Sequence, residues 1–442
     1  MSKKFAFIGA GSLDFTRDLV RDILTFDHFC DCEIWLMDID EKRLEYSKRG
    51  IEKIIEKGKY RASVHATNNR LKALQDADGV LITVLQGGVD VWRHDIEIPK
   101  KYGIDICVGD TRGPSGIFRF LRTAPVLLDI IRDVERVCPQ AIVLNYTNPM
   151  AMLVSYLQAQ SEVNVTGLCH SVQGTALMLA KWIGADIKDI EYTCAGINHQ
   201  AFYVDYRWKG EDAYPLLKEA IKRPEVANEE KVRIEMFKYL QYFPTESSGH
   251  NSEYNPWFRK REDLIETYCS NGTGWNPGEY AYILKEYLKR EETWESEYSE
   301  WLEDGDFELT RGEEYASHIF NAIFGDHEPF YFNGNLRNDG YITNIVDGAC
   351  VEVPVVATRK GITVTKRLEL PQHIATFVSH SAQLEELAVA GAIEGDAYKV
   401  FSAILMDPLT ASVLSMEETN VMVKEMFEKN KEYLGYFKKI NF

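Results

Sequence analysis

A cysteine and a histidine occupy positions from which they could hold a metal ion. Cys169 follows the apolar run at residues 165–168, and His199 ends a Gly-Ile-Asn-His motif after a second apolar segment. A thiolate and an imidazole brought together from two strand ends form half of a divalent-metal site and leave positions open for substrate oxygens. Taken singly, a cysteine is usually a small buried hydrophobe and a histidine a satisfied core or surface residue. The metal site is therefore a hypothesis that depends on the fold.

Two further polar segments follow strand candidates. We predict a glycine-rich loop at residues 108–116 that carries the oppositely charged Asp110 and Arg112, although an ordinary surface loop can have this composition. Asn145 ends the strand candidate at 141–145, and Asn148 lies just beyond it. Asparagine amides at such positions can hold a nicotinamide ribose or sugar hydroxyls, while Asn148 could also cap the following helix. Ligands of open α/β sheets bind beyond the carboxyl ends of the strands, so we expect chemistry at these segments.

The first forty residues predict a dinucleotide-binding unit. An apolar run at 5–8 leads into Gly9-Ala10-Gly11-Ser12, and a second run, at 32–37, ends at Asp38. The glycines let backbone N–H groups and a helix N-terminus approach a pyrophosphate, while the acid accepts the ribose hydroxyls. Asp14 stands where a third glycine is usual, so the fingerprint is incomplete. We expect Gly9, Gly11, Ser12, Asp38 and Asn145 to bind a nicotinamide or flavin cofactor, and Asp38 favours NAD over NADP because it repels a 2′-phosphate.

Apolar and helical patterns alternate along the first part of the chain. Strand candidates at 5–8, 32–37, 79–83, 141–145 and 165–168 alternate with helical patterns such as 41–57 and 120–137. This alternation predicts an α/β fold with a doubly wound parallel sheet of the Rossmann type. Beyond it the sequence suggests a helix at 175–183, a β-rich segment at 192–208 and charged helices near 229–240 and 280–303. We expect an NAD-binding domain at 1–195 and a catalytic and oligomerisation domain at 196–442, with a cleft between them.

Composition limits the classes of partner. At 442 residues the chain exceeds the usual size of one core, and its 50 basic and 68 acidic residues give a formal charge of −18. This excess of negative charge argues against nucleic acid and anionic membranes as binding partners. We see no signal-peptide pattern and no apolar run long enough to span a bilayer, so we expect a cytoplasmic protein. The 8 cysteines lack paired spacing apart from Cys30 and Cys32, which suggests reduced thiols.

Several motifs in a fixed order resemble glycoside hydrolase family 4, the NAD- and manganese-dependent glycosidases. They are Gly-Ala-Gly-Ser, Gly-Asp-Thr-x-Gly-Pro-x-Gly, Asn-Tyr-x-Asn-Pro-Met, Cys-His-Ser-Val-Gln-Gly-Thr and Gly-Ile-Asn-His, followed by residues 242–250, 253–257 and 335–340. The sequence Cys-His-Ser resembles the α-galactosidase (melibiase) branch, whereas phospho-glucosidase branches typically carry Asp or Asn after the cysteine. Uronidase branches can also carry histidine there. The resemblance implies a lactate/malate-dehydrogenase-like fold joined to an α+β catalytic domain.

The resemblance also implies a mechanism that differs from that of glycosidases with two carboxylates. Oxidation of the sugar at C3 by NAD acidifies the C2 proton, whose removal lets the C1 substituent leave by elimination. Water then adds, and the hydride returns to C3, so no net oxidation occurs. A divalent metal bound to the C2 and C3 oxygens stabilises the negative charge that develops there.

The resemblance assigns roles to individual residues. Cys169 and His199 match the metal ligands, although a thiolate and an imidazole alone would favour zinc, so manganese follows from the resemblance. His170 is interpreted as a general acid or a contact to sugar hydroxyls, or alternatively as a group that orients Cys169. Tyr254 is the candidate base for the C2 proton, with Tyr242 and Tyr146 as alternatives.

The remaining assignments concern the sugar. Asp110 is a candidate catalytic or sugar-binding residue, Asn148 a candidate substrate contact, and Arg337 a group that would orient a hydroxyl or, in a uronidase, a carboxylate. The same family offers α-galacturonidase, α-glucuronidase and 6-phospho-α-glucosidase as alternatives. A different class, an NAD-dependent 2-hydroxy acid dehydrogenase, lacks a convincing arginine–aspartate–histidine set here, and a non-catalytic NAD-responsive protein would need no metal site. The resemblance suggests a homodimer or homotetramer.

Overall fold

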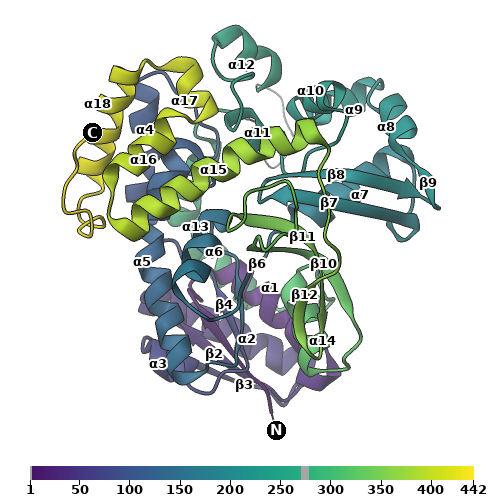
Figure 1. Cartoon of the computed structure of the whole chain (residues 1–442). Coiled ribbons are helices and arrows are strands. Elements are labelled where there is room, and N and C mark those ends of the chain that lie inside the picture. The colour runs from purple at the N-terminus through teal and green to yellow at the C-terminus, as the bar shows by residue number, and fades with distance from the viewer. Residues whose placement is uncertain (1, 270–277) are drawn as a thin grey trace.

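The computed structural model describes residues 2–269 and 278–442 and contains one sheet that runs through the molecule (Figure 1). Its first part comprises β1 (Lys4–Ile8), β2 (Glu33–Met37), β3 (Ser63–Thr67), β4 (Gly79–Ile82), β5 (Ile142–Asn145) and β6 (Val165–Gly167). These strands pair in parallel in the order β3-β2-β1-β4-β5-β6. This is the order of the dinucleotide-binding fold, so the predicted doubly wound sheet is confirmed.

The helices beside these strands cover both faces of the parallel part. They are α1 (Leu13–Leu24), α2 (Glu41–Gly58), α3 (Arg70–Leu74), α4 (Gly88–Lys101), α5 (Gly113–Val137) and α6 (Met150–Gln160), whereas α7 (Ser171–Ile183) packs against side chains between Cys194 and Leu217 in the second part of the sheet. The prediction of a loop through residue 116 and a helix from residue 120 is wrong, because α5 already begins at Gly113. Glycine normally disfavours a helix interior. Here it is required, because a Cβ on Gly116 would lie 2.4 Å from the carbonyl carbon of Thr111.

The second part of the sheet is antiparallel. It consists of β7 (Ile190–Ile197), β8 (Gln200–Trp208), β9 (Glu211–Asp212), β10 (Phe330–Arg337), β11 (Cys350–Thr358) and β12 (Gly361–Val364). β10 joins β6, and β11 joins both β10 and β7. The pairings Gly167–Asn335, Asn335–Glu352 and Glu352–Gly196 form one row of residues across four strands. The sheet therefore continues through the predicted boundary at residue 195/196, which falls inside β7, and the division into 1–195 and 196–442 stays a prediction.

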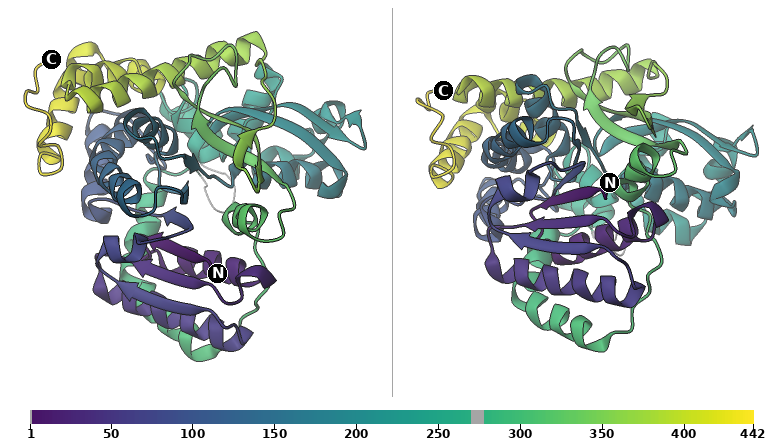
Figure 2. Two further views of the ribbon diagram at one scale, coloured as in Figure 1. Left: turned by 60° about the horizontal axis from the view of Figure 1, so that its bottom comes forward. Right: turned by 90° about the horizontal axis from the view of Figure 1, so that it is seen from below.

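Helices from the second half of the chain also pack against the first half. They are α8 (Tyr214–Ala220), α9 (Pro224–Glu229), α10 (Lys231–Leu240), α11 (Ser248–Glu253), α12 (Glu262–Tyr268), α13 (Tyr282–Asp304), α14 (Tyr315–Phe324), α15 (Gln372–Glu394), α16 (Ala397–Leu405), α17 (Pro408–Val413) and α18 (Met416–Lys429). Figure 2 shows α13 along the outer side of the N-terminal part, where Glu291 and Glu295 pair with Arg43 and Lys42 of α2. The two halves of the chain are thus intertwined.

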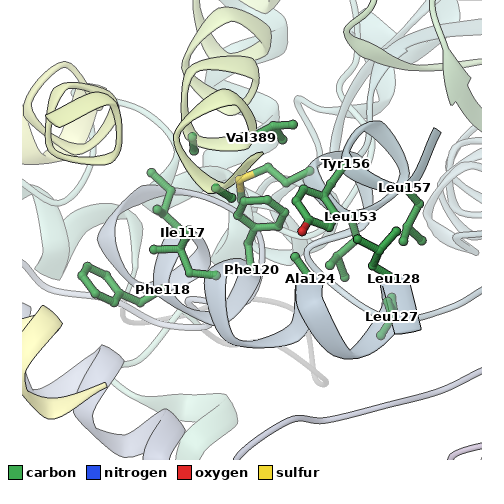
Figure 3. Packing of buried hydrophobic residues seen from close by; sticks show 14 of the residues in the cluster. Ile117, Phe118, Phe120, Ala124, Leu127, Leu128, Leu153, Tyr156, Leu157 and Val389 are labelled. Atoms are coloured by element: carbon green, nitrogen blue, oxygen red, sulfur yellow. The ribbon is translucent and has the colours of Figure 1, made fainter. Parts of the chain in front are cut away.

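A buried apolar cluster joins α5 and α6 to the long helix α15 (Figure 3). Phe120 of α5 has no exposed surface and meets the ring of Tyr156 on α6 edge to face, with 5.8 Å between ring centroids. Val389 of α15 lies above this pair (Figure 3). Apolar burial of this kind holds α15 in place over the helices of the parallel sheet. Across residues 2–269 and 278–442, every helix is too short or too polar to cross a membrane.

We expect Phe120→Ala to lower the free energy of unfolding by about 3–5 kcal/mol, because the truncation leaves a cavity among side chains that cannot fully collapse. Chemical denaturation followed by circular dichroism measures this loss. Leu177→Ala is the control, because Leu177 on α7 is 43% exposed, and surface substitutions usually change stability by less than about 0.5 kcal/mol. Equal losses in the two variants would contradict the assignment of Phe120 to the core.

Candidate active site

The turn between β1 and α1 is shaped for close approach of a ligand to the backbone. Gly9 has a φ of +92°, and a Cβ there would lie 2.1 Å from the carbonyl oxygen of Thr83. The exposed Ser12 precedes α1, and its side chain makes no capping hydrogen bond. The first N–H groups of α1 therefore lack a side-chain acceptor from Ser12, as suits a helix that receives a phosphate.

Asp38 stands beside this turn, at the end of β2. Its Oδ2 accepts the N–H of Gly11 at 2.7 Å, and its Oδ1 accepts the N–H of Asp40 at 2.9 Å. These bonds fix the carboxylate at the position expected for a ribose acceptor. Asn145 is fully buried, and its amide exchanges hydrogen bonds with the backbone of Thr147. It organises its own loop, and its role as a ribose contact stays a prediction.

Cys169 and His199 meet in space, as the sequence predicts. Cys169 lies two residues beyond the end of β6, and His199 lies at the turn between β7 and β8. Cys169 Sγ and His199 Nε2 are 3.3 Å apart, and Glu246 Oε2 lies 3.5 Å from the same Nε2. Donors that bind one ion at about 2.0–2.3 Å lie roughly 3–4 Å from each other. The three donor atoms fall within 4.8 Å of one another, so the cluster fits one divalent ion.

The other nitrogen of His199 is held by neighbouring hydroxyls. Nδ1 lies 2.8 Å from Thr111 Oγ1 and 3.4 Å from the hydroxyl of Tyr254. Such partners fix the ring orientation of a metal-binding histidine. Burial lowers the pKa of His199 to about 4, against an opposing effect of Glu246, which leaves the imidazole neutral as ligation requires. Burial raises the pKa of the Cys169 thiol well above its ordinary value, so a metal must displace its proton.

A buried histidine connects the two carboxylates nearest this cluster. His250 of α11 places Nδ1 3.3 Å from Glu246 Oε1 and Nε2 3.5 Å from Asp110 Oδ1. Burial alone would lower the pKa of His250, but Glu246 and Asp110 outweigh it and raise the pKa to about 9. Burial likewise works against ionisation of Asp110, but the hydrogen bond and charge of His250 hold its pKa well below the usual range. The two carboxylates therefore stabilise the protonated form of His250.

Sequence reasoning assigned no role to Glu246 or His250. Both lie in the run Thr245-Glu246-Ser247-Ser248-Gly249-His250, where an acid and a histidine four residues apart stand among small polar residues. That spacing is the signal that could have found them. It is a weak signal, because the contact with Cys169 and His199 depends on how residues 245–250 pack against β8.

Residues 4–185 match the model of the family 4 glycosyl hydrolases, and residues 194–410 match that of the C-terminal domain of the same family. The chain belongs to glycoside hydrolase family 4. It is 36% identical to an α-galactosidase of Rhizobium meliloti, over 99% of this chain and 90% of that protein. It is also 36% identical to an α-galactosidase of Bacillus subtilis, over 99% of this chain and 100% of that protein.

Solved structures agree on the fold. The "putative glucosidase lplD" of Bacillus subtilis has a TM-score of 0.86 at 23% identity, with 96% of this chain and 99% of that chain covered. A 6-phospho-α-glucosidase from gut microorganisms, solved with NAD and Mn²⁺, has a TM-score of 0.81 at 19% identity and covers 98% of this chain and 99% of its own. A malate dehydrogenase of Cryptosporidium parvum reaches 0.52 at 18% identity, over 89% of this chain and 100% of that chain. The dehydrogenase-like fold of this family 4 protein is confirmed.

Among the three candidate base tyrosines of this family 4 protein, the structure places Tyr254 at the metal cluster. The ring of Tyr242 packs against those of Tyr214 and His373, and the hydroxyl of Tyr146 accepts the N–H of Ala316. Burial raises the pKa of Tyr254 well above its ordinary value, and the Arg112 guanidinium, 4.7 Å from the ring centre, opposes this.

The remaining assigned residues differ in their distance from the cluster. Asn148 donates to Asp110 Oδ2 at 3.1 Å and so joins it. The side chain of His170 is 66% exposed and lies 3.5 Å from Glu314, whereas the Cys169 thiol donates to Ser171. The structure thus favours Ser171 over His170 as the group that orients Cys169.

Arg337 lies away from the cluster. β10 runs antiparallel to β6 with Asn335 opposite Gly167, so Arg337 extends toward the start of β6, whereas Cys169 lies beyond its end. The exposed Arg337 accordingly bonds through its N–H to Gln158, near the end of α6. This placement does not support a contact between Arg337 and a sugar at the cluster of the same chain.

The loop that carries Asp110 and Thr111 is held by a buried carboxylate. Glu253 accepts the N–H groups of Cys107 and Val108 at 2.9 Å through Oε2 and that of Gly109 at 2.8 Å through Oε1. One side chain thus satisfies three consecutive buried donors, and it sets the position of the loop that reaches His199 and Asn148.

We expect Glu253→Ala to destabilise the protein and to reduce turnover, because each buried N–H left unpaired costs about 1–3 kcal/mol and the loop then shifts Asp110 and Thr111. Thermal unfolding and steady-state kinetics measure the two effects, while NAD affinity should change little. Glu297→Ala, at an exposed position of α13, is the control. A Glu253→Ala protein with parental stability and turnover would refute this role.

Proposed function

We propose that this chain is an NAD- and manganese-dependent α-galactosidase that hydrolyses α-galactosides by transient oxidation at C3. The observation that carries the proposal is the close approach of Cys169 Sγ and His199 Nε2, which lie 3.3 Å apart beyond the ends of β6 and β7. The glycine turn between β1 and α1, shaped for a dinucleotide, belongs to the same sheet. A metal site beside a dinucleotide fold suits redox-assisted elimination, the exception among glycosidases. The 36% identity to two proteins named α-galactosidase supports the choice of sugar.

The chain's own groups fit both cofactors. Gly9, Gly11 and Ser12 leave the start of α1 open for a pyrophosphate, and Asp38 is oriented for ribose hydroxyls. Cys169 and His199 offer donors for a divalent ion. When bound, NAD supplies a reversible hydride acceptor and the metal a positive charge that stabilises oxyanions at C2 and C3. A related 6-phospho-α-glucosidase was solved with NAD and Mn²⁺.

Protein side chains would handle the protons and the sugar hydroxyls. Tyr254, with its hydroxyl 3.4 Å from His199, is the proposed base for the C2 proton. Burial and the Asp110 charge raise the pKa of its phenol, so the phenolate that this role requires depends on the positive charge of a bound metal ion. His170 is exposed next to Cys169, from where it is proposed to protonate the leaving group. Asp110 and Asn148 form a hydrogen-bonded pair proposed to bind sugar hydroxyls, and among the described residues the carbonyl oxygen of the Asn148 side chain has no hydrogen-bond partner.

The position of Arg337 bears on the choice between a galactoside and a uronide. A uronidase needs a cation for the substrate carboxylate, and Arg337 was the candidate for that task. Because it lies toward the opposite end of β6 from Cys169, the galactoside is favoured. An α-galacturonidase of Thermoanaerobacterium saccharolyticum is also less similar to this chain, at 28% identity.

The compartment and the assembly are part of the same proposal. Thiols such as those of Cys169, Cys194 and Cys350, which take part in no disulfide, suit the reducing cytoplasm. A formal charge of −18 disfavours nucleic acid and anionic membranes as partners. Exposed apolar side chains on the C-terminal helices, such as Tyr398 and Met416, are consistent with a homodimer or homotetramer.

We expect the enzyme to cleave a chromogenic α-galactoside in preference to the matching α-galacturonide and 6-phospho-α-glucoside. Cleavage should require NAD, Mn²⁺ and a reductant together, because each supports a different part of the site, and no NADH should accumulate. Absorbance assays with each component omitted measure this. Cleavage of another sugar with the same requirements would move the substrate assignment, whereas net NADH formation with a 2-hydroxy acid would indicate the dehydrogenase.

We expect Asp38→Ala to weaken NAD binding by roughly 10–100-fold, because a hydrogen bond to a charged group contributes about 1.5–3 kcal/mol. The preference for NAD over NADP should also fall, since the repulsion of a 2′-phosphate is removed. Calorimetry with both nucleotides measures this. Cys169→Ala is the control, because it should retain NAD binding while losing hydrolysis. An Asp38→Ala protein with parental NAD affinity would contradict the assignment.

A further inference from the structure

We infer that Glu246 is a third protein ligand of the metal ion, and that it selects a hard divalent cation in place of zinc. The inference deepens the proposed function, on which it rests for the presence of a metal. Neither the cysteine and histidine motifs nor the matches to other proteins assign this residue a role. Its Oε2 lies 3.5 Å from His199 Nε2, and one of its carboxylate oxygens lies within 4.8 Å of Cys169 Sγ.

The backbone fixes Glu246 next to His199. Thr245 donates its N–H to the carbonyl of Ala201 at 2.9 Å, and the Ala201 N–H donates to the Thr245 hydroxyl at 3.3 Å. Ala201 comes two residues after His199, so these bonds hold the neighbours of both donors together. Glu246 and His199 are both non-glycine residues in the left-handed region, with φ of +66° and +61°. Such conformations persist where the surrounding structure enforces them, often at functional sites.

The two oxygens of Glu246 have different surroundings. Oε1 lies 3.3 Å from His250 Nδ1, and His250 Nε2 lies 3.5 Å from Asp110. Oε1 thus faces His250, and Oε2 faces His199. Metal-binding carboxylates are commonly oriented by neighbouring polar groups. If Glu246 served only to neutralise the charge of His250, its second oxygen would not need to lie beside Cys169 and His199.

The chemistry of the donors explains what Glu246 adds. A thiolate and an imidazole alone favour zinc, whereas carboxylate oxygens suit manganese and magnesium. An anionic oxygen therefore shifts the preference of the cluster toward harder ions. Three protein ligands still leave positions of a six-coordinate ion for substrate oxygens.

The test is metal binding by the apo-protein, without NAD or sugar. Mn²⁺ titrations followed by electron paramagnetic resonance, and competition with Zn²⁺, compare the parent protein with Glu246→Gln. The substitution keeps the size of the side chain and removes the anionic donor. We expect Mn²⁺ affinity to fall at least 10–100-fold, the loss typical of groups that support a metal ligand, and Zn²⁺ affinity to fall less. The ratio of Mn²⁺ to Zn²⁺ affinity therefore decreases.

Glu386→Gln is the matched control. Glu386 of α15 is half-buried and accepts a hydrogen bond from the Ser155 hydroxyl at 2.5 Å, and its oxygens are not among the clustered donor atoms. This variant should bind both metals as the parent does. If Glu246→Gln does not fold, Glu246→Asp decides, because withdrawing the carboxylate by one methylene lowers Mn²⁺ affinity only if the oxygen binds the ion.

Two outcomes overturn the inference: parental Mn²⁺ affinity and metal ratio in the Glu246 variants, or equal losses in Glu246→Gln and Glu386→Gln. Failure of this inference can be distinguished from failure of the proposed function, because the metal titration involves no sugar. A protein that hydrolyses no glycoside and yet loses Mn²⁺ upon Glu246→Gln would retain the ligand assignment and reject the activity.

Discussion

The row of paired residues Gly167–Asn335–Glu352–Gly196 is the constraint on which the active site depends. It joins the parallel strand β6 to the antiparallel strand β7 through β10 and β11. Cys169 follows one end of this row by two residues, and His199 follows the other by three. Both end residues are glycines in tight surroundings, since a Cβ on Gly167 would lie 2.5 Å from Met150 and one on Gly196 2.5 Å from the Gln200 carbonyl. The sheet itself thus brings the thiolate and the imidazole together.

Around this pair, other segments supply orientation and charge. The loop before α5 provides Thr111 and Asp110, the residues before and within α11 provide Glu246 and His250, and Glu253 holds the first of these segments through its N–H groups. Each polar group is therefore positioned by another buried polar group. Such networks fix geometry well when every member is satisfied, because an unpaired member in a low dielectric is costly. A redox-assisted elimination needs this rigidity, since the same groups must serve oxidation, proton removal and water addition.

Local sequence predicted the parts of the fold that depend on local signals. The strands that end at Ile8, Met37 and Asn145 are apolar runs followed by glycine or polar turns, and their parallel order follows from the alternation with helices. The sequence did not reveal β3, because its alternate residues, such as Ser63 and His65, are exposed at the sheet edge. It also placed the start of α5 too late, since glycine disfavours helices unless tertiary contacts demand it.

The same distinction between local and long-range signals applies to the residues of the candidate site. Cys169 and His199 could be predicted because each follows a strand within a distinctive motif. Glu246 and His250 could not, because their place depends on the long-range pairing of Thr245 with Ala201. Arg337 looked like a substrate contact by motif alone, and the antiparallel register of β10 directs it toward the other end of β6. Register is a property of pairing between distant segments, which a single sequence does not display.

The central claim is that the glycosidic bond breaks after removal of the C2 proton at the site formed by Cys169, His199 and Tyr254. Hydrolysis of an α-galactoside in D₂O, with the released sugar examined by NMR, tests it most directly. The account predicts deuterium at C2 of the product, because the removed proton exchanges before C2 is protonated again. Hydrolysis that leaves C2 fully protonated would contradict the account and would indicate direct displacement at C1.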